Sequence, residues 1–381
     1  MVIISRHALP FREGFFLSPD NQGLLLNSPY SFDIIILIFM ILRKEDVMVY
    51  SFGLVKHANI RYRDSLNRLS RCELLSMLHS CSVDCEVIIE TMGGCDFLTF
   101  DCRPLSASEV SYLSGHSCVS FLASKTGEML RPLSFECNDY LNKDLPEILK
   151  YKGKTSVAFT RMMLNTARSL TPFHPAAELT MLDPLCGKGT SCFCALQSGM
   201  NALGMDKDAK SIREASEYFS RYLRFYMLKH SVTNRSETAG KHSVPVTEFV
   251  FSDCRENYLK GDTRFLRFGS GDTTDAFALC RKTPVHIILA DLPYGVQHAP
   301  QSGNQPESFK SLLSRALPVW KRVLLPGGII AISFNTLTFP THQVHEIARS
   351  SGLEPMENAV FSNLRHEVEQ AVVRDVVFMR N

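Results

Sequence analysis

The sequence lacks a strong charge of either sign. Lysine and arginine nearly balance aspartate and glutamate, which leaves a net charge of +2 and a pI near 8.0. A balance this mild does not identify a nucleic-acid-binding protein, so any basic surface must be local. The contents of hydrophobic residues (45%) and charged residues (21%) are ordinary for a globular protein, which excludes long disorder and fibrous structure.

The sequence also lacks cysteines at zinc-ligand spacing. Its twelve cysteines contain no recurring CxxC pair, and the closest groupings are Cys192/Cys194 and Cys81/Cys85. We therefore expect no metal site. Reduced cysteines that pack as small hydrophobic residues are typical of a cytoplasmic protein, which is the location we expect.

No hydrophobic run is long enough to cross a membrane. The longest, "IIILIFMIL" at residues 34–42, has about half the length that a bilayer span needs. It begins too late for a secretory signal and lacks a small-residue cleavage site. We expect residues 1–47 to be a poorly structured leader or to precede a natural start at Met48, and we expect no membrane association.

Residues 48–147 predict a small α+β domain. Short strands are indicated at "MVYSFGLV", "CEVIIETM", "CDFLTFDC" and "CVSFLAS", and "RDSLNRLSRCELLSML" has the leucine spacing of an amphipathic helix. Four arginines surround the start of this helix. They fit either a solvated face or a surface that contacts the phosphates of a polynucleotide. These residues are Arg61, Arg63, Arg68 and Arg71.

Residues 148–381 predict a second domain in which strands and helices alternate. The helix "VAFTRMMLNTARSL", with Thr155 or Ser156 as its N-cap, comes first. Strands follow at "LTMLD", "NALGMD", "VTEFVFSD", "VHIILAD" and "IIAISFN", with helices between them. This alternation is typical of a parallel, doubly wound α/β sheet. "NAVFSN" and "QAVVRDVVFM" predict a closing hairpin, and the polar stretches 233–245 and 261–277 predict surface loops.

The first predicted strand of this sheet ends in the turn "DPLCGKGT", residues 183–190. Gly187 and Gly189 allow a tight turn and let the backbone approach a ligand at the start of the next helix. The turn is not a phosphate-binding P-loop, because the GK[ST] element is absent, and Cys192 breaks the GxGxxG pattern.

Aspartates close the first three predicted strands, at Asp183, Asp206 and Asp253. In a sheet of this kind, ligands bind beyond the carboxyl ends of the strands. Each aspartate alone is more often a helix N-cap, but the set with its glycine turn predicts a pocket for an adenosine. No basic cluster is present for a pyrophosphate, so the rest of the ligand should be zwitterionic.

The fourth predicted strand ends in Asp291, Leu292, Pro293 and Tyr294. A carboxylate and a backbone carbonyl here can accept the N–H groups of an exocyclic amine and align it for methyl transfer from a sulfonium. Pro293 removes a backbone donor and stiffens the turn. Tyr294 offers a face on which a base can stack, worth roughly 1–3 kcal/mol.

The pair of motifs "DPLCGKGT" and "DLPYG" resembles those of class I S-adenosylmethionine-dependent amino-methyltransferases. More narrowly, it resembles tRNA guanosine-N2 methyltransferases related to the Trm-eleven and THUMP-associated enzymes. The resemblance covers about residues 150–381. It implies a Rossmann-like, seven-stranded methyltransferase sheet with an inserted antiparallel last strand, S-adenosylmethionine as cofactor, and a smaller N-terminal α+β domain of the kind read above.

The resemblance also implies roles for individual residues. The methionine part of the cofactor would contact the helix before the first strand and the glycine turn, whereas the ribose and the adenine would contact the next two strand ends. The family's usual D-P-P-Y carries Leu292 at its second position here, which keeps the carbonyl but loses one proline ring. The implied cofactor residues are Thr160, Asp183, Cys186, Gly187, Gly189, Asp206 and Asp253, and the implied target-base residues are Asp291, Leu292, Pro293, Tyr294 and Gly295.

The leading hypothesis is therefore an RNA methyltransferase that acts on guanosine N2 of tRNA. The same turn chemistry also serves an N6-adenine or N4-cytosine amino-methyltransferase of DNA or ribosomal RNA. A third hypothesis, of a different class, is a nucleic-acid-binding module with a degenerate pocket. We expect an RNA partner, tRNA before other RNAs, and the sequence leaves open whether the N-terminal domain binds RNA and whether an activating subunit or a homodimer is needed.

Overall fold

The computed structural model describes residues 47–55, 60–134, 139–151, 153–174, 178–240, 242–292, 301–302, 305–357, 364–369 and 372–381. Residues Val49–Asn381 form one compact unit, and Met1–Met48 form another. The expected leader thus lies almost entirely outside the described residues. The division into domains at residues 147 and 148 stays a prediction, because both parts belong to the same unit.

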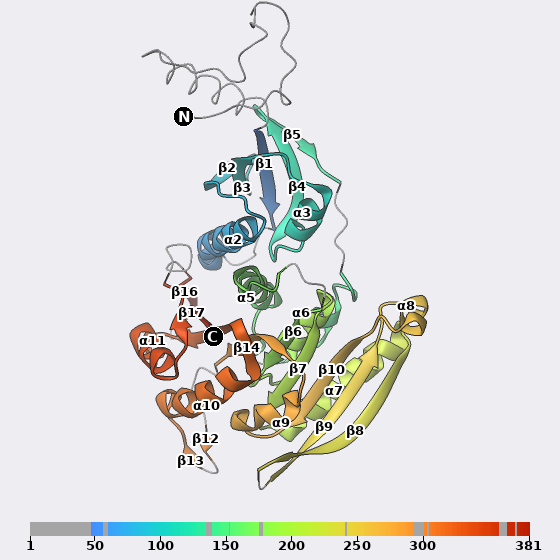
Figure 1. Ribbon diagram of the computed structural model, residues 1–381. Helices are drawn as coiled ribbons and strands as arrows, with labels where there is room; N and C mark the ends of the chain where they lie inside the picture. The colour runs from blue at the N-terminus through green and yellow to red at the C-terminus, as the bar shows by residue number, and fades with distance from the viewer. Residues whose placement is uncertain are drawn as a thin grey trace, which may run out of the picture. The chain divides into compact units, whose positions relative to one another are not determined.

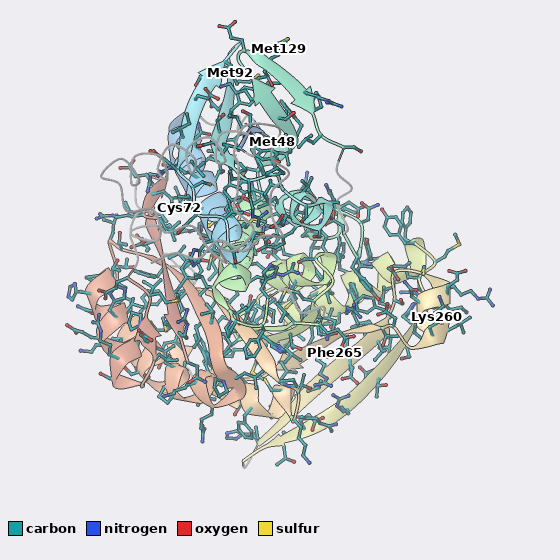
Figure 2. The ribbon with its side chains drawn as sticks, turned by 45° about the horizontal axis from the view of Figure 1, so that its top comes forward. Met48, Cys72, Met92, Met129, Lys260 and Phe265 are labelled. Carbon is teal, nitrogen blue, oxygen red and sulfur yellow. The ribbon has the colours of Figure 1, made fainter. Side chains whose placement is uncertain are left out.

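The first sheet has five strands in the order β2-β3-β1-β4-β5 (Figure 1). Its core contains Phe52, Leu74, Leu98 and Leu122, so one face of the sheet packs against helix α2. Figure 2 shows Met92 and Met129 at the tips of its two hairpins, at the same end of the sheet. The strands and the helix expected here are confirmed. The elements are β1 (Met48–Leu54), α2 (Ile60–Ser80), β2 (Val87–Met92), β3 (Cys95–Cys102), α3 (Ala107–Leu113), β4 (Val119–Thr126) and β5 (Met129–Pro132).

Helix α2 also contributes to the core of the following part of the chain. Leu69 and Cys72 pack in the same cluster as residues of α5 (Val157–Leu170), and Figure 2 labels Cys72 on α2. Helix α5 spans the residues predicted for it, but its N-cap, Ser156, makes no side-chain capping bond. The short helix α4 (Leu145–Ile148) precedes it.

The second sheet has ten strands, and its main path runs β15-β17-β14-β11-β6-β7-β10-β9-β8, with β16 paired to β17. Strands β10, β7, β6, β11 and β14 run parallel. The strands are β6 (Thr180–Asp183), β7 (Asn201–Asp206), β8 (His230–Ala239), β9 (His242–Phe251), β10 (Arg264–Ser270), β11 (Val285–Asp291), β14 (Leu324–Asn335), β15 (Glu354–Pro355), β16 (His366–Glu369) and β17 (Val372–Arg380). A separate pair is formed by β12 (Gln301–Ser302) and β13 (Gln305–Pro306).

Helices cover both faces of this sheet, as a doubly wound fold requires. One core cluster holds residues of α5, α6 and α7, and the other holds residues of α9, α10 and α11. The helices are α6 (Thr190–Gln197), α7 (Ala209–Phe225), α8 (Arg255–Lys260), the 3₁₀ turn η1 (Thr273–Asp275), α9 (Ala276–Cys280), α10 (Phe309–Val323) and α11 (Thr341–Ser350). None of the helices in the described part of the chain has both the length and the apolar character needed to traverse a bilayer.

The expected last strand is confirmed. Strand β17 is antiparallel and lies between β14 and β15. It also forms a hairpin with β16, at residues 366–369, whereas the predicted partner "NAVFSN" lies outside the described residues. The sheet has ten strands and not the expected seven, because the hairpin β8–β9 and the strand β16 are added to the run β15-β17-β14-β11-β6-β7-β10.

The predicted third parallel strand was assigned to the wrong residues. "VTEFVFSD" lies mostly in β9, which runs antiparallel to β10. The parallel strand beside β7 is β10, at Arg264–Ser270, inside a stretch that was predicted as a loop. The other predicted loop forms the hairpin β8–β9. Both errors arise because these strands carry many polar residues on their solvent-facing or ion-paired sides.

Candidate functional site

A cavity of about 700 Å³ opens at the carboxyl ends of the parallel strands. The ends of β6, β7, β10 and β11 all contribute residues to it, and these strands are neighbours in the sheet (Figure 1). Its volume is in the range of sites for small molecules and cofactors. The cavity therefore lies where an α/β sheet binds its ligand.

The glycine turn between β6 and α6 forms one wall. Gly187 and Gly189 have positive φ angles of 51° and 82°, which L-residues with side chains rarely adopt. A Cβ atom at Gly189 would lie 2.8 Å from the ring of Phe268, so this position requires glycine sterically. At Gly187 a Cβ atom would meet nothing within 4 Å, so the backbone there is open to a ligand.

Two of the predicted aspartates hold this turn in place. Asp206 accepts hydrogen bonds from the backbone N–H of Gly187 (2.7 Å) and of Asp208 (2.9 Å), and burial raises its pKa. Asp183 accepts from the N–H of Leu185 (2.9 Å) and from the hydroxyl of Ser191. Burial raises the pKa of Asp183 to about 7.

The third predicted aspartate, Asp253, does not line the cavity. It follows β9, and because β9 runs antiparallel to β10, its end lies at the opposite edge of the sheet. There Asp253 accepts hydrogen bonds from Asn257 (2.9 Å) and Ser252 (3.0 Å). The residue that takes its place at the cavity is Asp272, which follows β10.

Asp272 belongs to an ion-paired cluster that sequence reasoning missed. Arg315 of α10 donates to both oxygens of Asp272 and to both oxygens of Glu307. Burial works to raise the pKa of Asp272, but the hydrogen bonds from Arg315 and Thr274 outweigh it and lower the pKa to about 2. The alternation in "RFLRFGS", followed by Gly271 and Asp272, was the sequence signal that could have located this site.

Asp291 ends β11 and faces the same cavity. Its Oδ2 accepts a hydrogen bond from the hydroxyl of Thr155, which precedes α5. Its Oδ1 is buried and accepts no hydrogen bond from any described residue. The next residue, Leu292, is 1% exposed, and its N–H donates to the carbonyl of Ser333 at 2.9 Å. Pairing with Ser333 of β14 therefore holds the backbone that carries Asp291.

Other residues reach the cavity from α5 and the glycine turn. The predicted residues Thr160 and Cys186 both line it, and burial raises the pKa of the Cys186 thiol. Thr160 is buried and donates its hydroxyl to the carbonyl of Ser156. Tyr151, which was not predicted, lines the cavity and forms a 2.9 Å hydrogen bond with Thr190.

The remaining three predicted residues, Pro293, Tyr294 and Gly295, lie outside the described residues. Within the described ranges, no three or more His, Cys, Asp and Glu side chains are grouped so that they could hold a metal ion.

The charges around the cavity favour a cationic or zwitterionic ligand. Arg315 offsets one of the two negative charges of Asp272 and Glu307, and Lys188 pairs with Glu214 on α7. Lys207 and Asp208 also line the cavity, and Asp183, Asp206 and Asp291 lie at its strand ends. A field of carboxylates repels phosphates and attracts ammonium or sulfonium groups.

Comparisons with known proteins give distant likenesses. No protein-family model matches the sequence, and none of the curated proteins matches it. TrmN from Thermus thermophilus is 17% identical, with a match that covers 78% of this chain and 62% of its own and a TM-score of 0.36. The ribosomal RNA methyltransferase aviRa from Streptomyces viridochromogenes is 14% identical, over 61% of this chain and 88% of its own, with a TM-score of 0.36.

A third solved structure with some likeness is a TehB-like S-adenosylmethionine-dependent methyltransferase from Corynebacterium glutamicum. It is 18% identical, over 53% of this chain and 80% of its own, with a TM-score of 0.31. The chain spans less than two thirds of TrmN. At these identities and TM-scores the likenesses carry no conclusion about function, which must come from the site itself.

Proposed function

We propose that this protein is a methyltransferase that uses S-adenosylmethionine to methylate an exocyclic amine of an RNA base. The observation that carries the proposal is the meeting, in one cavity, of the glycine turn, Asp206 and Asp291. A buried acceptor that lacks a donor is costly, and Oδ1 of Asp291 is such an acceptor among the described residues. An amine N–H of a target base would satisfy it.

The residues of the cavity fit S-adenosylmethionine. When bound, this cofactor supplies a methyl group on a sulfonium, which needs no phosphate-binding residues. The open backbone at Gly187 accommodates close approach, and the carboxylate of Asp206 suits its positive charge. Asp206 ends β7 and lines the cavity beside the glycine turn, where its carboxylate would accept a hydrogen bond from a ribose hydroxyl. Asp272 takes the place that was expected of Asp253 near the adenine.

Asp291 would hold the base amine and receive its proton. Its Oδ1 accepts one N–H of the amine and the carbonyl of Leu292 accepts the other, which directs the nitrogen lone pair toward the methyl group. In the proposed reaction a nitrogen–carbon bond forms, the carbon–sulfur bond breaks, and one amine proton passes to Asp291. The N–H of Leu292 donates to the carbonyl of Ser333, which holds the peptide between Asp291 and Leu292 in place.

Guanosine N2 of tRNA is the proposed target. The support for this finer assignment is the resemblance of "DPLCGKGT" and "DLPYG" to the tRNA guanosine-N2 enzymes. Tyr294 and Pro293 keep the proposed roles of a stacking face and a rigid turn for the base.

The test is to incubate the purified protein and radiolabelled S-adenosylmethionine with total tRNA, ribosomal RNA and DNA. Mass spectrometry of the nucleosides should then identify N2-methylguanosine in the tRNA fraction. N6-methyladenosine or N4-methylcytidine as the product would overturn the guanosine assignment and leave the reaction type standing. Binding of RNA without any methyl transfer would instead identify a degenerate, nucleic-acid-binding module.

Substitution of Asp291 separates chemistry from cofactor binding. Asp291→Asn should lower kcat by about 10²- to 10³-fold, because the acceptor for the amine proton is lost. Its affinity for the cofactor, measured by calorimetry, should stay unchanged. Asp206→Ala should instead weaken cofactor binding. If both variants had the same effect on cofactor affinity, the assignment of the two ends of the cavity would be wrong.

A further inference from the structure

A second cavity, of about 660 Å³, lies between α7 and the hairpin β8–β9, and we call it the α7 groove. It arises because the hairpin extends the sheet beyond β10, whereas α7 packs over β7 and β10. Helix α9 packs on the hairpin, and it belongs to the layer on the other face of the sheet. On the α7 side the hairpin stays open in the described part of the chain, and Val232 there is 44% exposed.

Three arginines of α7 line this groove and are exposed: Arg213, Arg221 and Arg224. Arg224 donates to the carbonyl of Ser220. Among the described residues, the three guanidinium groups have no acidic partner within 4.0 Å. At 1.5 Å of rise per residue, Arg213 and Arg224 are about 16 Å apart along the helix. The groove therefore carries an extended row of positive charge.

The other charges at the groove do not cancel this row. Arg235 also borders it, but Arg235 is paired with Glu237 and Glu248. Glu217 is the one acidic residue among the described lining residues. Asn234 already uses its Oδ1 to accept from Thr247, so its NH₂ group is the part left to donate. The groove is thus built from donors and positive charges, which suits a polyanion.

The α7 groove meets the cofactor cavity at the first turn of α7 and at the end of β10. Ser211 and Asp272 line the cofactor cavity, while Ala209 and Ser270 line the groove. A ligand along the groove would therefore lead to the edge of the catalytic cavity. Because that cavity is lined with carboxylates and the whole chain has a net charge of only +2, a nucleic acid needs a local basic surface to stay bound.

We infer that the α7 groove binds the phosphodiester backbone of the RNA whose base enters the catalytic cavity, an inference that rests on the proposed function. Guanidinium groups match phosphate oxygens with paired hydrogen bonds. A row of three arginines over about 16 Å fits several successive phosphates better than one compact anion. Backbone contacts of this kind position an RNA without reading its sequence.

The test measures how RNA binding depends on salt. The triple variant Arg213→Gln/Arg221→Gln/Arg224→Gln and the wild type are titrated with unfractionated tRNA and with a labelled oligouridylate, from about 50 to about 200 mM salt. Each lost phosphate contact lowers the slope of log K against log salt by about 0.7 to 0.9, so the slope should fall by about 2. Affinity at low salt should fall at least about tenfold, while kcat at saturating RNA stays unchanged.

Two controls make the result specific to the groove. The variant Lys282→Gln/Lys310→Gln/Arg322→Gln removes the same charge from exposed residues on the α9–α10 side of the sheet and should keep the wild-type slope. Glu217→Gln removes the acid from the groove and should tighten binding. A control triple variant that lost as much affinity as the groove variant would show only an effect of net charge and would overturn the inference.

The outcomes also separate this inference from the proposed function. If the wild type methylates RNA and the groove variant keeps its affinity and slope, the groove inference alone fails. If no RNA is methylated but RNA binding by the groove variant has the smaller salt slope, the proposed reaction is wrong and the groove remains an RNA-binding surface. Displacement of bound RNA from the groove by polyglutamate as effectively as by polyuridylate would identify a site for acidic proteins instead.

Discussion

At the scale of single residues, Thr155 is expected to act on the proposed reaction through Asp291. Its hydroxyl donates to Oδ2 of Asp291, across 136 positions of the chain, and leaves Oδ1 as the oxygen that has no partner among the described residues. Thr155 is thus a positioning residue: it selects which oxygen meets the amine and holds the carboxylate plane.

The prediction compares two variants of this residue. Thr155→Val removes the hydroxyl and nearly keeps the shape, so kcat should fall by about tenfold or more, in line with 1.5–3 kcal/mol for a hydrogen bond to a charged group. Thr155→Ser keeps the hydroxyl and should restore most of kcat. Steady-state kinetics should show KM for S-adenosylmethionine unchanged in both variants. Equal loss of kcat in the serine and valine variants would mean that Thr155 contributes only packing.

Asp183 should make the stability of the protein depend on pH. Its pKa is about 7 in the folded protein against an ordinary value of 3.8, so the folded state holds the proton over this range and the unfolded state releases it. The stabilisation is fully present below about pH 4 and is lost as the pH rises through about 7. At about 1.4 kcal/mol per pKa unit, its upper limit is about 4 kcal/mol.

The measurement is denaturant unfolding at a series of pH values from about 4 to about 8. Asp183→Asn cannot ionise, so it should lose much of the decline in stability that the wild type shows over this range. The exposed carboxyl of Glu86 supplies a control, since Glu86→Gln should follow the wild-type curve. A difference between wild type and Asp183→Asn that did not vary with pH would contradict the assigned pKa shift.

At the scale of elements, the direction of β9 decides which aspartate lies at the cavity proposed for the cofactor. β10, and not β9, is the parallel neighbour of β7, so Asp272 lies at the cavity and Asp253 lies at the opposite edge. Asp272→Ala should weaken S-adenosylmethionine binding by about tenfold, because it removes an acceptor and leaves Arg315 partly unpaired. Asp253→Ala should leave cofactor affinity unchanged in the same calorimetric titration. A larger loss of cofactor affinity in Asp253→Ala than in Asp272→Ala would support the strand assignment made from the sequence and contradict the observed topology.

The elements that the sequence predicted well share one property, a hydrophobic pattern that their own residues set. Helix α5 and strands β6, β7 and β11 are buried on the sides that their patterns indicated, and the turn at Gly187 and Gly189 carried its backbone requirement in its residue types. Strand β10 was missed because its arginines read as polar loop residues. In the fold, Arg264 is buried over the ring of Tyr140, and Arg267 pairs with Glu248.

Contacts between distant elements could not be predicted from the sequence. The bond from Thr155 to Asp291 and the cluster of Arg315 with Asp272 and Glu307 depend on which strands become neighbours. A strand pattern with a period of two residues gives the same signal whichever way the strand runs. The sequence therefore could not show that Asp253 lies at the end of the sheet away from the cavity, or that Asp272 lies beside the cavity. The residue types at each strand end could be read from the local sequence. Which strand ends meet in the cavity depends on the sheet topology.

At the scale of the whole molecule, a buried carboxylate joins the first sheet to the helices of the second. Glu73 of α2 is fully buried, and its Oε1 accepts hydrogen bonds from the side chain of Asn165 on α5 (2.7 Å) and from the N–H of Ser117 (2.8 Å). Asn165 also donates to the carbonyl of Gly115 at 2.9 Å. Because Leu69 and Cys72 pack in the core that contains α5, the two sheets should unfold as one cooperative unit.

The variant Asn165→Ala tests whether the two sheets unfold cooperatively. It removes two hydrogen bonds that connect α5 to Glu73 of α2 and to the turn at Gly115, and it should cost about 1–3 kcal/mol of unfolding free energy. Hydrogen exchange should then show β1, β3 and β4 opening at a lower free energy than β6 and β11, whereas the wild type opens them together. Asn67→Ala is the matched control, because the bond from Asn67 to Asp96 (3.0 Å) lies within the first part of the chain and its loss should not uncouple the sheets. If the two sheets already opened separately in the wild type, Glu73 would be a local feature of the first core, and α2 would pack on α5 without transmitting stability to the catalytic cavity.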